Sequence, residues 1–273
     1  MPISTCSPLR ILNVAVWRRH YRLTTDLAYG TGQRQRLDVY VPRHMTANPA
    51  VVIFFFGGRW QSGDKRDYRF VGEALTSKGL IAVIPNYRLY PEVDWRGFLR
   101  DGASAYAWVE QNIARFHGNP TRAFLMGHSA GAYIAAMLAL DPAWRRAAGS
   151  ETAPCGLIGV AGPYDFLPFT DIDVQRIFST AQHAIDTQPI HYVSPTAPPA
   201  LLLTGASDTT VRPRNAIHLA TALRAHSDRS QVIEYRGVAH ISILLSLAAP
   251  FRFLAPTLRD TVAFIQALHC PAR

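Results

Sequence analysis

The stretch that decides the fold reads Phe124-Leu125-Met126-Gly127-His128-Ser129-Ala130-Gly131. Residues 123–126 form a short apolar run of the kind expected in a strand that is buried on both faces. An alanine-rich apolar stretch follows Ser129 as far as Leu140, and Asp141-Pro142 ends the helix that it predicts. The serine therefore stands on a sharp turn from a strand into a helix.

The glycines around this serine have a steric role. Gly127 and Gly131 lie two residues before and after Ser129, where the turning backbone packs too closely for side chains. The turn lifts the Ser129 hydroxyl above the sheet and leaves the amide of Ala130 at a helix N-terminus, which suits an oxyanion. A G-x-S-x-G motif is common by chance, but between a strand and a helix it indicates a nucleophile rather than a helix-capping serine.

Strand-like and helix-like patterns alternate along the rest of the chain. Runs rich in β-branched and aromatic residues predict strands at 37–41, 51–56, 80–84, 123–126, 157–160, 201–203 and 232–235. Helices are predicted at 64–78, 97–116, after Ser129 to Leu140, 213–226 and 256–269. This alternation predicts an α/β fold whose mostly parallel sheet has helices on both faces. We expect one domain over residues 1–273, with an N-terminal arm at about 1–30 around the outside and a lid insertion at about 166–199.

A serine hydroxyl is a weak nucleophile and needs a base, which a carboxylate in turn orients. For a serine on such a turn the expected chain order is serine, acid, histidine. Asp208 follows the predicted strand 201–203, and His240 follows the predicted strand 232–235. Both lie just beyond carboxyl ends of strands, where active sites of open α/β sheets are found.

Other acids and histidines were candidates for these roles. Asp165 also follows a predicted strand, but Asp208 is favoured because the loop after the next-to-last strand is the usual position of the acid. His128 precedes the serine, and because its side chain diverges at the turn we expect it to line the site at most. Structural or surface histidines are expected at His183, His191, His218, His226 and His269.

A second glycine motif lies early in the chain, at Phe56-Gly57-Gly58-Arg59-Trp60. Two consecutive glycines after a buried strand let the backbone turn and bring its amides close to a substrate carbonyl. An ordinary glycine turn is the alternative, and the motif around Ser129 favours the oxyanion-binding interpretation.

The Gly-Gly-x-Trp loop, the stretch Pro85-Asn86-Tyr87-Arg88-Leu89, the turn around Ser129, Asp208 and His240 together resemble the carboxylesterase branch of the α/β-hydrolase superfamily. The set is similar to its hormone-sensitive-lipase-like, kynurenine-formamidase-like and bacterial feruloyl-esterase-like members, over about residues 35–268. The resemblance implies an oxyanion hole formed by the amides of Gly58, Arg59 and Ala130. The chain departs from the family at Phe56, where the loop usually begins with His. The amides do not depend on that side chain, so the oxyanion hole is expected to survive, but the hydrogen bonds of that His to neighbouring loops and the assignment to one branch do not carry over.

The expected function is hydrolysis of small to medium carboxylic esters, aryl esters included, through an acyl-enzyme. No metal or organic cofactor is expected. An arylformamidase-type amidohydrolase and a non-catalytic binding protein with the same fold are the alternatives. Trp60 and Tyr133 are expected to line the substrate site, with core packing nearly as plausible. The short lid favours small or medium acyl groups over long lipids.

Composition excludes several other classes of protein. The 273 residues contain 48% hydrophobic and 17% charged residues, as in compact globular proteins. The net charge of +9 comes from scattered basic residues without a nucleic-acid motif, so we expect no nucleic-acid partner. No apolar run reaches the roughly 18 residues needed to span a membrane.

The cysteines and the N-terminus leave the compartment open. Cys6, Cys155 and Cys270 form neither a metal-ligand spacing nor a redox pair, and one bridge from Cys155 to Cys270 is an unsupported option. Without a secretory signal the chain is expected to be cytoplasmic as written. Ile3-Ser4-Thr5-Cys6-Ser7 faintly resembles a lipoprotein cleavage site, so an envelope form is the alternative if the native start lies upstream.

Overall fold

A computed structural model describes residues 12–13, 16, 20–45, 47–227 and 229–270. Within these residues, eight strands form one sheet in the order β1-β2-β4-β3-β5-β6-β7-β8. The strands are β1 (Tyr21–Ala28), β2 (Arg36–Pro42), β3 (Val51–Phe55), β4 (Ile81–Pro85), β5 (Ala123–His128), β6 (Gly156–Val160), β7 (Ala200–Gly205) and β8 (Ser230–Tyr235). Strand β2 is antiparallel to β1 and β4, and the other neighbouring pairs are parallel.

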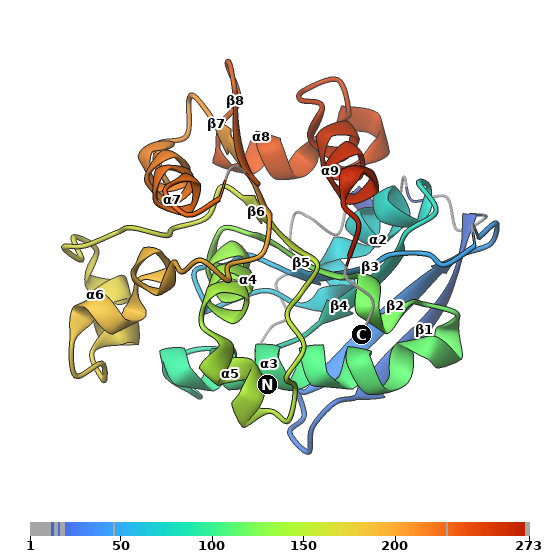
Figure 1. Cartoon of the computed structure of the whole chain (residues 1–273), viewed down its shortest axis with the longest axis horizontal. Helices are drawn as coiled ribbons and strands as arrows, with labels where there is room; N and C mark the ends of the chain where they lie inside the picture. The colour runs from blue at the N-terminus through green and yellow to red at the C-terminus, as the bar shows by residue number, and fades with distance from the viewer. Residues whose placement is uncertain (1–11, 14–15, 17–19, 46, 228, 271–273) are drawn as a thin grey trace, which may run out of the picture.

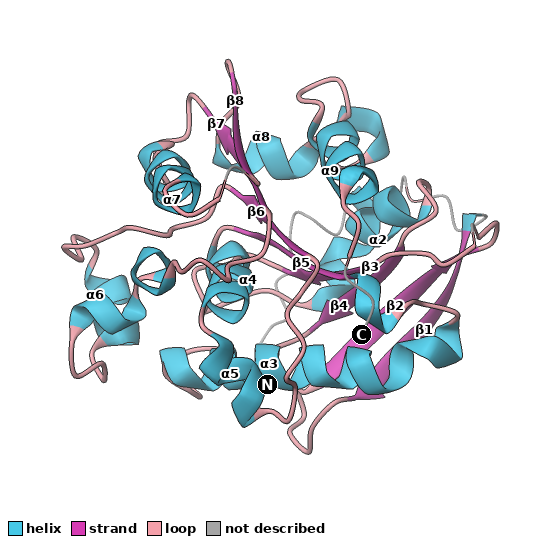
Figure 2. Cartoon of the chain, in the orientation of Figure 1, coloured by secondary structure: helices cyan, strands magenta, loops and turns pink. Residues whose placement is uncertain are grey.

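Helices cover both faces of this sheet. The α-helices are α2 (Arg69–Thr76), α3 (Trp95–Asn112), α4 (Ala130–Leu140), α5 (Pro142–Ala147), α6 (Ile172–Phe178), α7 (Arg214–Arg224), α8 (His240–Leu245) and α9 (Thr257–Ala267). Single turns of 3₁₀ helix are η3 (Lys65–Tyr68), η4 (Ile113–Phe116), η5 (Pro120–Arg122), η6 (Ala184–Thr187), η7 (Pro189–Tyr192) and η8 (Ala249–Phe251). Figure 1 shows α2 and α9 on one side of the sheet and α3, α4 and α7 on the other, and Figure 2 shows the loops that join them. The predicted α/β class is confirmed.

The core explains why the serine turn is fixed in place. Strands β3 to β6 are buried along their whole length, which agrees with their unbroken apolar sequences. Helix α4 is also buried at every residue, because it packs between the sheet and α3. A helix that is apolar all round is stable only in such a position. The N-terminus of α4, next to Ser129, is therefore held in place by the buried core.

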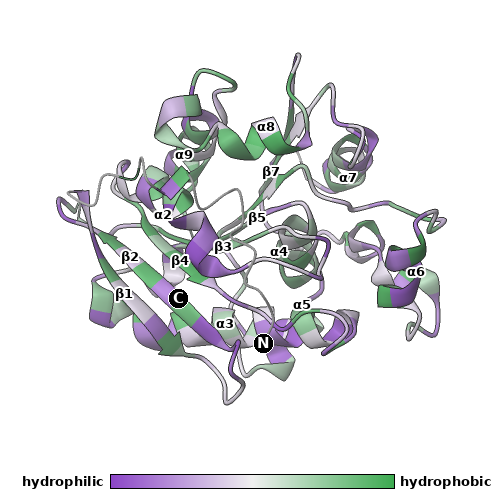
Figure 3. Ribbon diagram, turned by 180° about the vertical axis from the view of Figure 1, so that it is seen from behind, coloured by the Kyte–Doolittle hydropathy of each residue, from purple (hydrophilic) through white to green (hydrophobic). Residues whose placement is uncertain are grey.

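One expectation differs from the structure. The arm expected at about 1–30 contains an edge strand, β1, which pairs with β2 through a register shift between Thr24 and Leu27. Most β1 side chains are exposed or half-buried, so its sequence lacks the apolar alternation that would have predicted a strand. The rest of that arm, including the stretch Ile3 to Ser7, lies outside the described residues except for Leu12, Asn13, Val16, His20, Tyr29 and Gly30. Helix α8 is predominantly hydrophobic (Figure 3), and its Ile243 and Leu244 are buried in the core.

A disulfide joins Cys155, just before β6, to Cys270, beyond α9. It ties the C-terminal segment to the start of a central strand across 115 residues of sequence. The option left open by the sequence is therefore the pairing in the structure, while Cys6 lies outside the described residues.

Removing this bridge is expected to destabilise the fold. Cys270→Ser should lower the free energy of unfolding by about 2–4 kcal/mol, because the unfolded chain regains the freedom that a long closed loop removes. Urea unfolding of the oxidised wild type and of the variant measures the difference. A reducing agent should shift the wild-type midpoint to that of the variant and leave the variant unchanged. A wild-type midpoint that does not respond to reduction would contradict the prediction.

In the described part of the chain, no helix is both long and apolar enough to cross a membrane. The same residues contain no group of three or more His, Cys, Asp or Glu side chains that could hold a metal ion.

Candidate active site

Ser129 lies between the last residue of β5 and the first residue of α4, in a backbone conformation with φ 54° and ψ −122°. Such a positive φ is rare for a residue with a side chain and is found mainly where the surroundings impose it. Here the neighbours impose it: a Cβ at Gly127 would overlap the carbonyl of Gly131, and a Cβ at Gly131 would overlap the carbonyl of Phe55. The two glycines are thus a steric requirement of the turn.

His240 and Asp208 meet this serine in one hydrogen-bonded line. The Nε2 atom of His240 lies 2.9 Å from the Oγ atom of Ser129, and its Nδ1 atom lies 2.8 Å from Oδ2 of Asp208. The other carboxylate oxygen of Asp208 accepts hydrogen bonds from the amides of Thr210 and Val211, at 2.9 and 2.8 Å. The Asp208 side chain is fully buried and that of His240 is only 11% exposed. Water is therefore kept from the hydrogen bonds that orient the imidazole.

The strands bring these residues together. Asp208 follows β7, and His240 begins α8 after β8. The two loops are joined by backbone hydrogen bonds from Ala206 to the Tyr235 carbonyl and from Ser207 to the Val238 carbonyl, at 2.9 and 3.0 Å. The acid and the histidine are therefore held in register by the pairing of adjacent parallel strands.

The alternative acid, Asp165, has another partner. Its Oδ2 atom lies 2.6 Å from Nδ1 of His218 on α7, and both side chains are at least a third exposed. The structure does not bring it to His240. The remaining histidines expected on the surface are exposed, namely His183, His191, His218, His226 and His269.

His128 is buried behind the serine rather than in the pocket wall. Its Nε2 atom lies 3.0 Å from the backbone carbonyl of His240, and since a carbonyl only accepts, Nε2 carries the proton. Burial, with a smaller contribution from the charge of His240, lowers the pKa of His128 to about 3, so the ring is neutral. Its Nδ1 atom has no hydrogen-bond partner among the described residues and faces Gly57.

Neutral His128 should make stability depend on pH. In the unfolded chain a histidine binds a proton below about pH 6.5, whereas native His128 stays neutral to about pH 3. Stability is therefore lost as the pH falls below 6.5, by up to about 1.4 kcal/mol per pH unit from this group. Urea unfolding between pH 7 and pH 5 should show a steeper decline for the wild type than for His128→Gln, in which nothing titrates at this position. Equal slopes in the two proteins would contradict the prediction.

The glycine loop after β3, which contains Gly57 and Gly58, packs closely against the serine turn. A Cβ at Gly57 would lie 2.9 Å from Nδ1 of His128 and 3.1 Å from the Cβ of Ser129. Gly58 has φ 127°, and its carbonyl accepts hydrogen bonds from the amides of Gln61 and Ser62, both at 3.0 Å. In the part of the chain that the structure describes, the amides of Gly58, Arg59 and Ala130 have no protein acceptor. These amides, from two loops that meet at Ser129, could bind an oxyanion there.

An aromatic stack takes the place of the histidine usual at the start of this loop. The fully buried ring of Phe56 stacks between Tyr68 and Tyr87, with ring centroids 5.2 and 4.7 Å away. The hydroxyl of Tyr87 donates a hydrogen bond of 2.9 Å to the Phe56 carbonyl. The start of the loop is thus held by ring packing and one hydrogen bond to its backbone.

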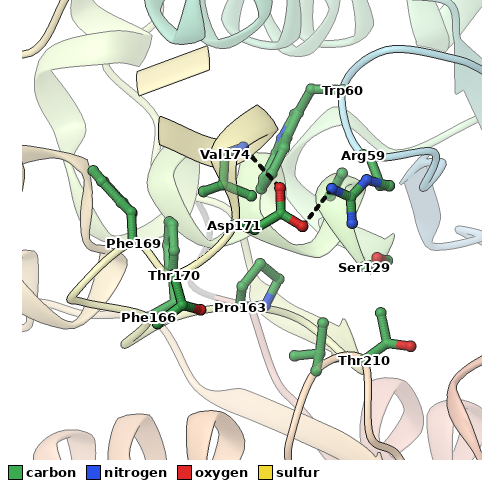
Figure 4. A pocket seen from close by; sticks show the side chains of 12 residues that line it. Arg59, Trp60, Ser129, Pro163, Phe166, Phe169, Thr170, Asp171, Val174 and Thr210 are labelled. Carbon is green, nitrogen blue, oxygen red and sulfur yellow. Dashed lines mark hydrogen bonds and ion pairs between the residues drawn. The ribbon is translucent and has the colours of Figure 1, made fainter. Parts of the chain in front are cut away.

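A pocket of about 180 Å³ opens beside Ser129 (Figure 4). Its wall is formed by Arg59, Trp60, Ser129, Ala130, Pro163, Phe166, Phe169, Thr170, Asp171, Val174, Thr210 and Val211. Trp60 is in the wall, as expected, but His128 and Tyr133 are not. Tyr133 is fully buried and meets the Trp60 ring edge-on at 5.4 Å, so it supports the wall from behind.

The lid predicted at about 166–199 lies between β6 and β7, where the chain forms α6, η6 and η7, and it supplies Phe166, Phe169 and Val174 to the pocket. The sequence did not point to Thr210, Val211 or Asp171 as wall residues. That Thr210 and Val211 lie close to the site could have been inferred from their position just after Asp208, because an aspartate carboxylate often accepts hydrogen bonds from the backbone amides that follow it. Asp171 could have been recognised as a helix N-cap, but not as a pocket residue.

With this geometry established, comparison with known proteins decides the family. Residues 37–223 match the family described as BD-FAE. The chain belongs to the BD-FAE family. Esterase LipC of Mycobacterium tuberculosis is 30% identical over 277 residues, which is 93% of this chain and 68% of LipC. Isoprenylcysteine alpha-carbonyl methylesterase ICME of Arabidopsis thaliana is 27% identical, over 81% of this chain and 57% of the relative.

Solved structures agree with the fold of this BD-FAE chain. Esterase B of Lactobacillus rhamnosis with a bound inhibitor gives a TM-score of 0.82 at 18% identity, covering 95% of this chain and 91% of that one. The hyperthermophilic esterase of Pyrobaculum calidifontis gives 0.76 at 20% identity, covering 95% and 90%. The resemblance to α/β-hydrolase carboxylesterases is confirmed. The chain spans about half to two thirds of the length of the curated relatives it matches.

Proposed function

We propose that this chain hydrolyses small to medium carboxylic esters, aryl esters included, through an acyl-enzyme on Ser129. The observation that carries the proposal is the continuous hydrogen-bonded line from Ser129 through His240 to buried Asp208. This arrangement can remove a proton from a hydroxyl and stabilise the imidazolium that results. Family membership and the esterases among the relatives support it further.

The proposed reaction has two symmetrical halves. His240 Nε2 accepts the Ser129 proton as Oγ forms a bond to the carbonyl carbon, and the carbonyl oxygen becomes an oxyanion bound by the amides of Gly58, Arg59 and Ala130. When the tetrahedral intermediate collapses, the C–O bond to the alcohol breaks and His240 protonates the leaving alcohol. A water molecule then repeats these steps on the acyl-enzyme and frees the acid.

The pocket supports the limit on substrate size. Its volume of about 180 Å³ is below the range of typical drug-sized sites, and Phe166, Phe169 and Val174 supply much of its apolar wall. Aromatic and branched side chains of this kind suit a short acyl chain or one aromatic ring.

A substrate panel with covalent labelling tests the proposal. We expect p-nitrophenyl esters of two to six carbons and aryl esters to be hydrolysed faster than longer esters and faster than N-formylkynurenine. A fluorophosphonate should abolish turnover and label the peptide that contains Ser129. Faster turnover of N-formylkynurenine would favour the arylformamidase alternative, whereas no turnover of any substrate and no labelling would favour a binding protein.

The compartment is a separate proposal. The cytoplasmic expectation stays a prediction, but the Cys155–Cys270 disulfide supports the envelope alternative, because disulfides persist mainly in oxidising compartments. Alkylation of thiols at the moment of cell lysis, followed by mass spectrometry, should find these two cysteines protected. If Cys155 and Cys270 are found alkylated, the cytoplasmic location is favoured instead.

A further inference from the structure

Two consecutive residues of the oxyanion loop have strained backbones. Arg59 has φ 55° and Trp60 has φ 59°, both in the left-handed region that residues with side chains seldom adopt. Such conformations persist only where the surrounding structure holds them. The amide of Arg59 is a proposed oxyanion donor, so the contacts that hold this backbone conformation also fix the orientation of the amide.

Both side chains are held by the same short helix, α6. The Arg59 guanidinium lies 2.8 Å from Oδ2 of Asp171, the residue that caps the start of α6 (Figure 4). It also lies 3.7 Å from Oδ2 of Asp173. The Trp60 ring meets the ring of Phe178, the last residue of α6, edge-on at 5.1 Å. The two ends of one helix thus hold two adjacent strained residues.

The Asp171 carboxylate divides its two oxygens between helix and loop. Oδ1 accepts hydrogen bonds from the amides of Asp173 and Val174, at 2.9 and 3.2 Å, and so caps α6. Oδ2 is thereby left for Arg59, at 2.8 Å. The hydrogen bond from Arg59 is the main reason that the pKa of Asp171 lies below its usual value, so this carboxylate remains charged at neutral pH.

The C-terminal end of α6 is attached to the rest of the protein independently of the loop. Phe178 is buried and its ring contacts those of Phe166 and Tyr133 at 5.6 and 5.5 Å. Next to it, the hydroxyl of Thr180 donates a hydrogen bond of 2.6 Å to Asp94, the N-cap of α3. Helix α6 therefore has a firm anchorage from which to hold the loop.

We propose that α6 is a clamp on the oxyanion loop, and that Asp171 and Phe178 are positioning residues for the amide of Arg59. The proposal rests on the proposed esterase function for its kinetic consequences. An oxyanion donor acts in the transition state, so a displaced donor lowers kcat and leaves KM nearly unchanged. The segment that lines the pocket would then contribute to catalysis for every ester, in addition to selecting acyl groups.

Asp171→Asn tests the clamp with little disturbance to the helix, because the amide oxygen can still cap α6. We expect kcat to fall about 3- to 5-fold for all acyl lengths, because the Arg59–Asp171 pair is half exposed and such a pair contributes little more than this. Asp173→Asn removes the same charge from the same helix without breaking the 2.8 Å contact, and should change kcat less than about twofold. Equal effects of the two substitutions, or a rise in KM alone, would overturn the proposal.

Substitutions of Arg59 separate strain from substrate binding. Glycine adopts a positive φ without strain, whereas alanine does not. Arg59→Ala should therefore lose more kcat than Arg59→Gly, and Asp171→Asn should add nothing further in the Arg59→Gly background. If the guanidinium instead binds substrate, Ala and Gly variants will lose activity equally and through KM, which would overturn the proposal.

Hydrogen exchange makes the result independent of turnover. Amides of residues 57–62 should exchange faster in Asp171→Asn than in the wild type and in Asp173→Asn. Faster exchange in a protein that hydrolyses no ester would support the clamp and reject the esterase function. If the exchange rates in Asp171→Asn are unchanged while the wild type hydrolyses esters, the clamp is rejected and the esterase function stands.

Discussion

Ser129→Ala is expected to reduce kcat for an aryl ester by about 10⁶-fold, the scale found when the nucleophile of a serine hydrolase is removed. The reason is geometric, because His240 Nε2 lies 2.9 Å from Oγ and contacts no other hydroxyl or thiol among the described residues. The oxyanion amides remain, so a residual rate of about 10³–10⁴ over water can persist. On one p-nitrophenyl ester, stopped-flow assays measure the rate of the wild type and long incubations measure the residual rate of Ser129→Ala.

Ser207→Ala is the matched control for this prediction. Ser207 is exposed beside Asp208, and its backbone amide bonds to the Val238 carbonyl, so the substitution removes a hydroxyl without altering the loop. We expect Ser207→Ala to keep the wild-type kcat, and we expect the unfolding midpoints of Ser207→Ala and Ser129→Ala to be unchanged. Turnover by Ser129→Ala within tenfold of the wild type would show that the nucleophile lies elsewhere.

The sequence predicted the parts of the site that backbone sterics and chain order impose. Gly127 and Gly131 mark the serine turn because no other residue fits there, and the motif is therefore visible in the sequence alone. Asp208 and His240 could be inferred because parallel strands end at one edge of a sheet, which brings distant loops together.

Contacts between side chains remote in sequence could not be inferred in this way. Arg59 and Asp171 are 112 residues apart, and neither residue type signals the other. Tyr133 follows the serine by four residues and looks like a pocket residue, yet the helix carries it behind Trp60. Such placements depend on how one layer packs on another, which periodicity within a single element does not reveal.

The sequence favoured Asp208 over Asp165, and the structure supplies the contacts that separate them. Both acids follow strands that end at the same sheet edge, and the sequence separates them only by the usual position of the acid. In the structure each has its own histidine, His240 or His218. Only the first of these pairs is buried and reaches Ser129.

Asp208→Asn is expected to lower kcat by about 10⁴-fold, as the same change does in serine proteases with this arrangement. The two amides of Thr210 and Val211 require an oxygen acceptor, so the asparagine must place its Oδ1 toward them. Its NH₂ group then faces Nδ1 of His240 and forces the proton onto Nε2. In that tautomer the imidazole cannot accept a proton from Ser129, although the geometry of all three residues is preserved. The measurement is kcat on a p-nitrophenyl ester, together with the unfolding midpoint.

Asp165→Asn provides the matched control, because it makes the same chemical change in the other aspartate–histidine pair. Its side chain is a third exposed and its partner His218 half exposed, so weakening their hydrogen bond should cost less than about 1 kcal/mol of stability. In the described part of the chain no hydrogen bond joins that pair to Ser129, so kcat should stay within twofold of the wild type. If Asp165→Asn instead lost activity while Asp208→Asn retained it, the line through His240 would not be the one that activates the serine, because only the acid bonded to the working histidine can set its tautomer.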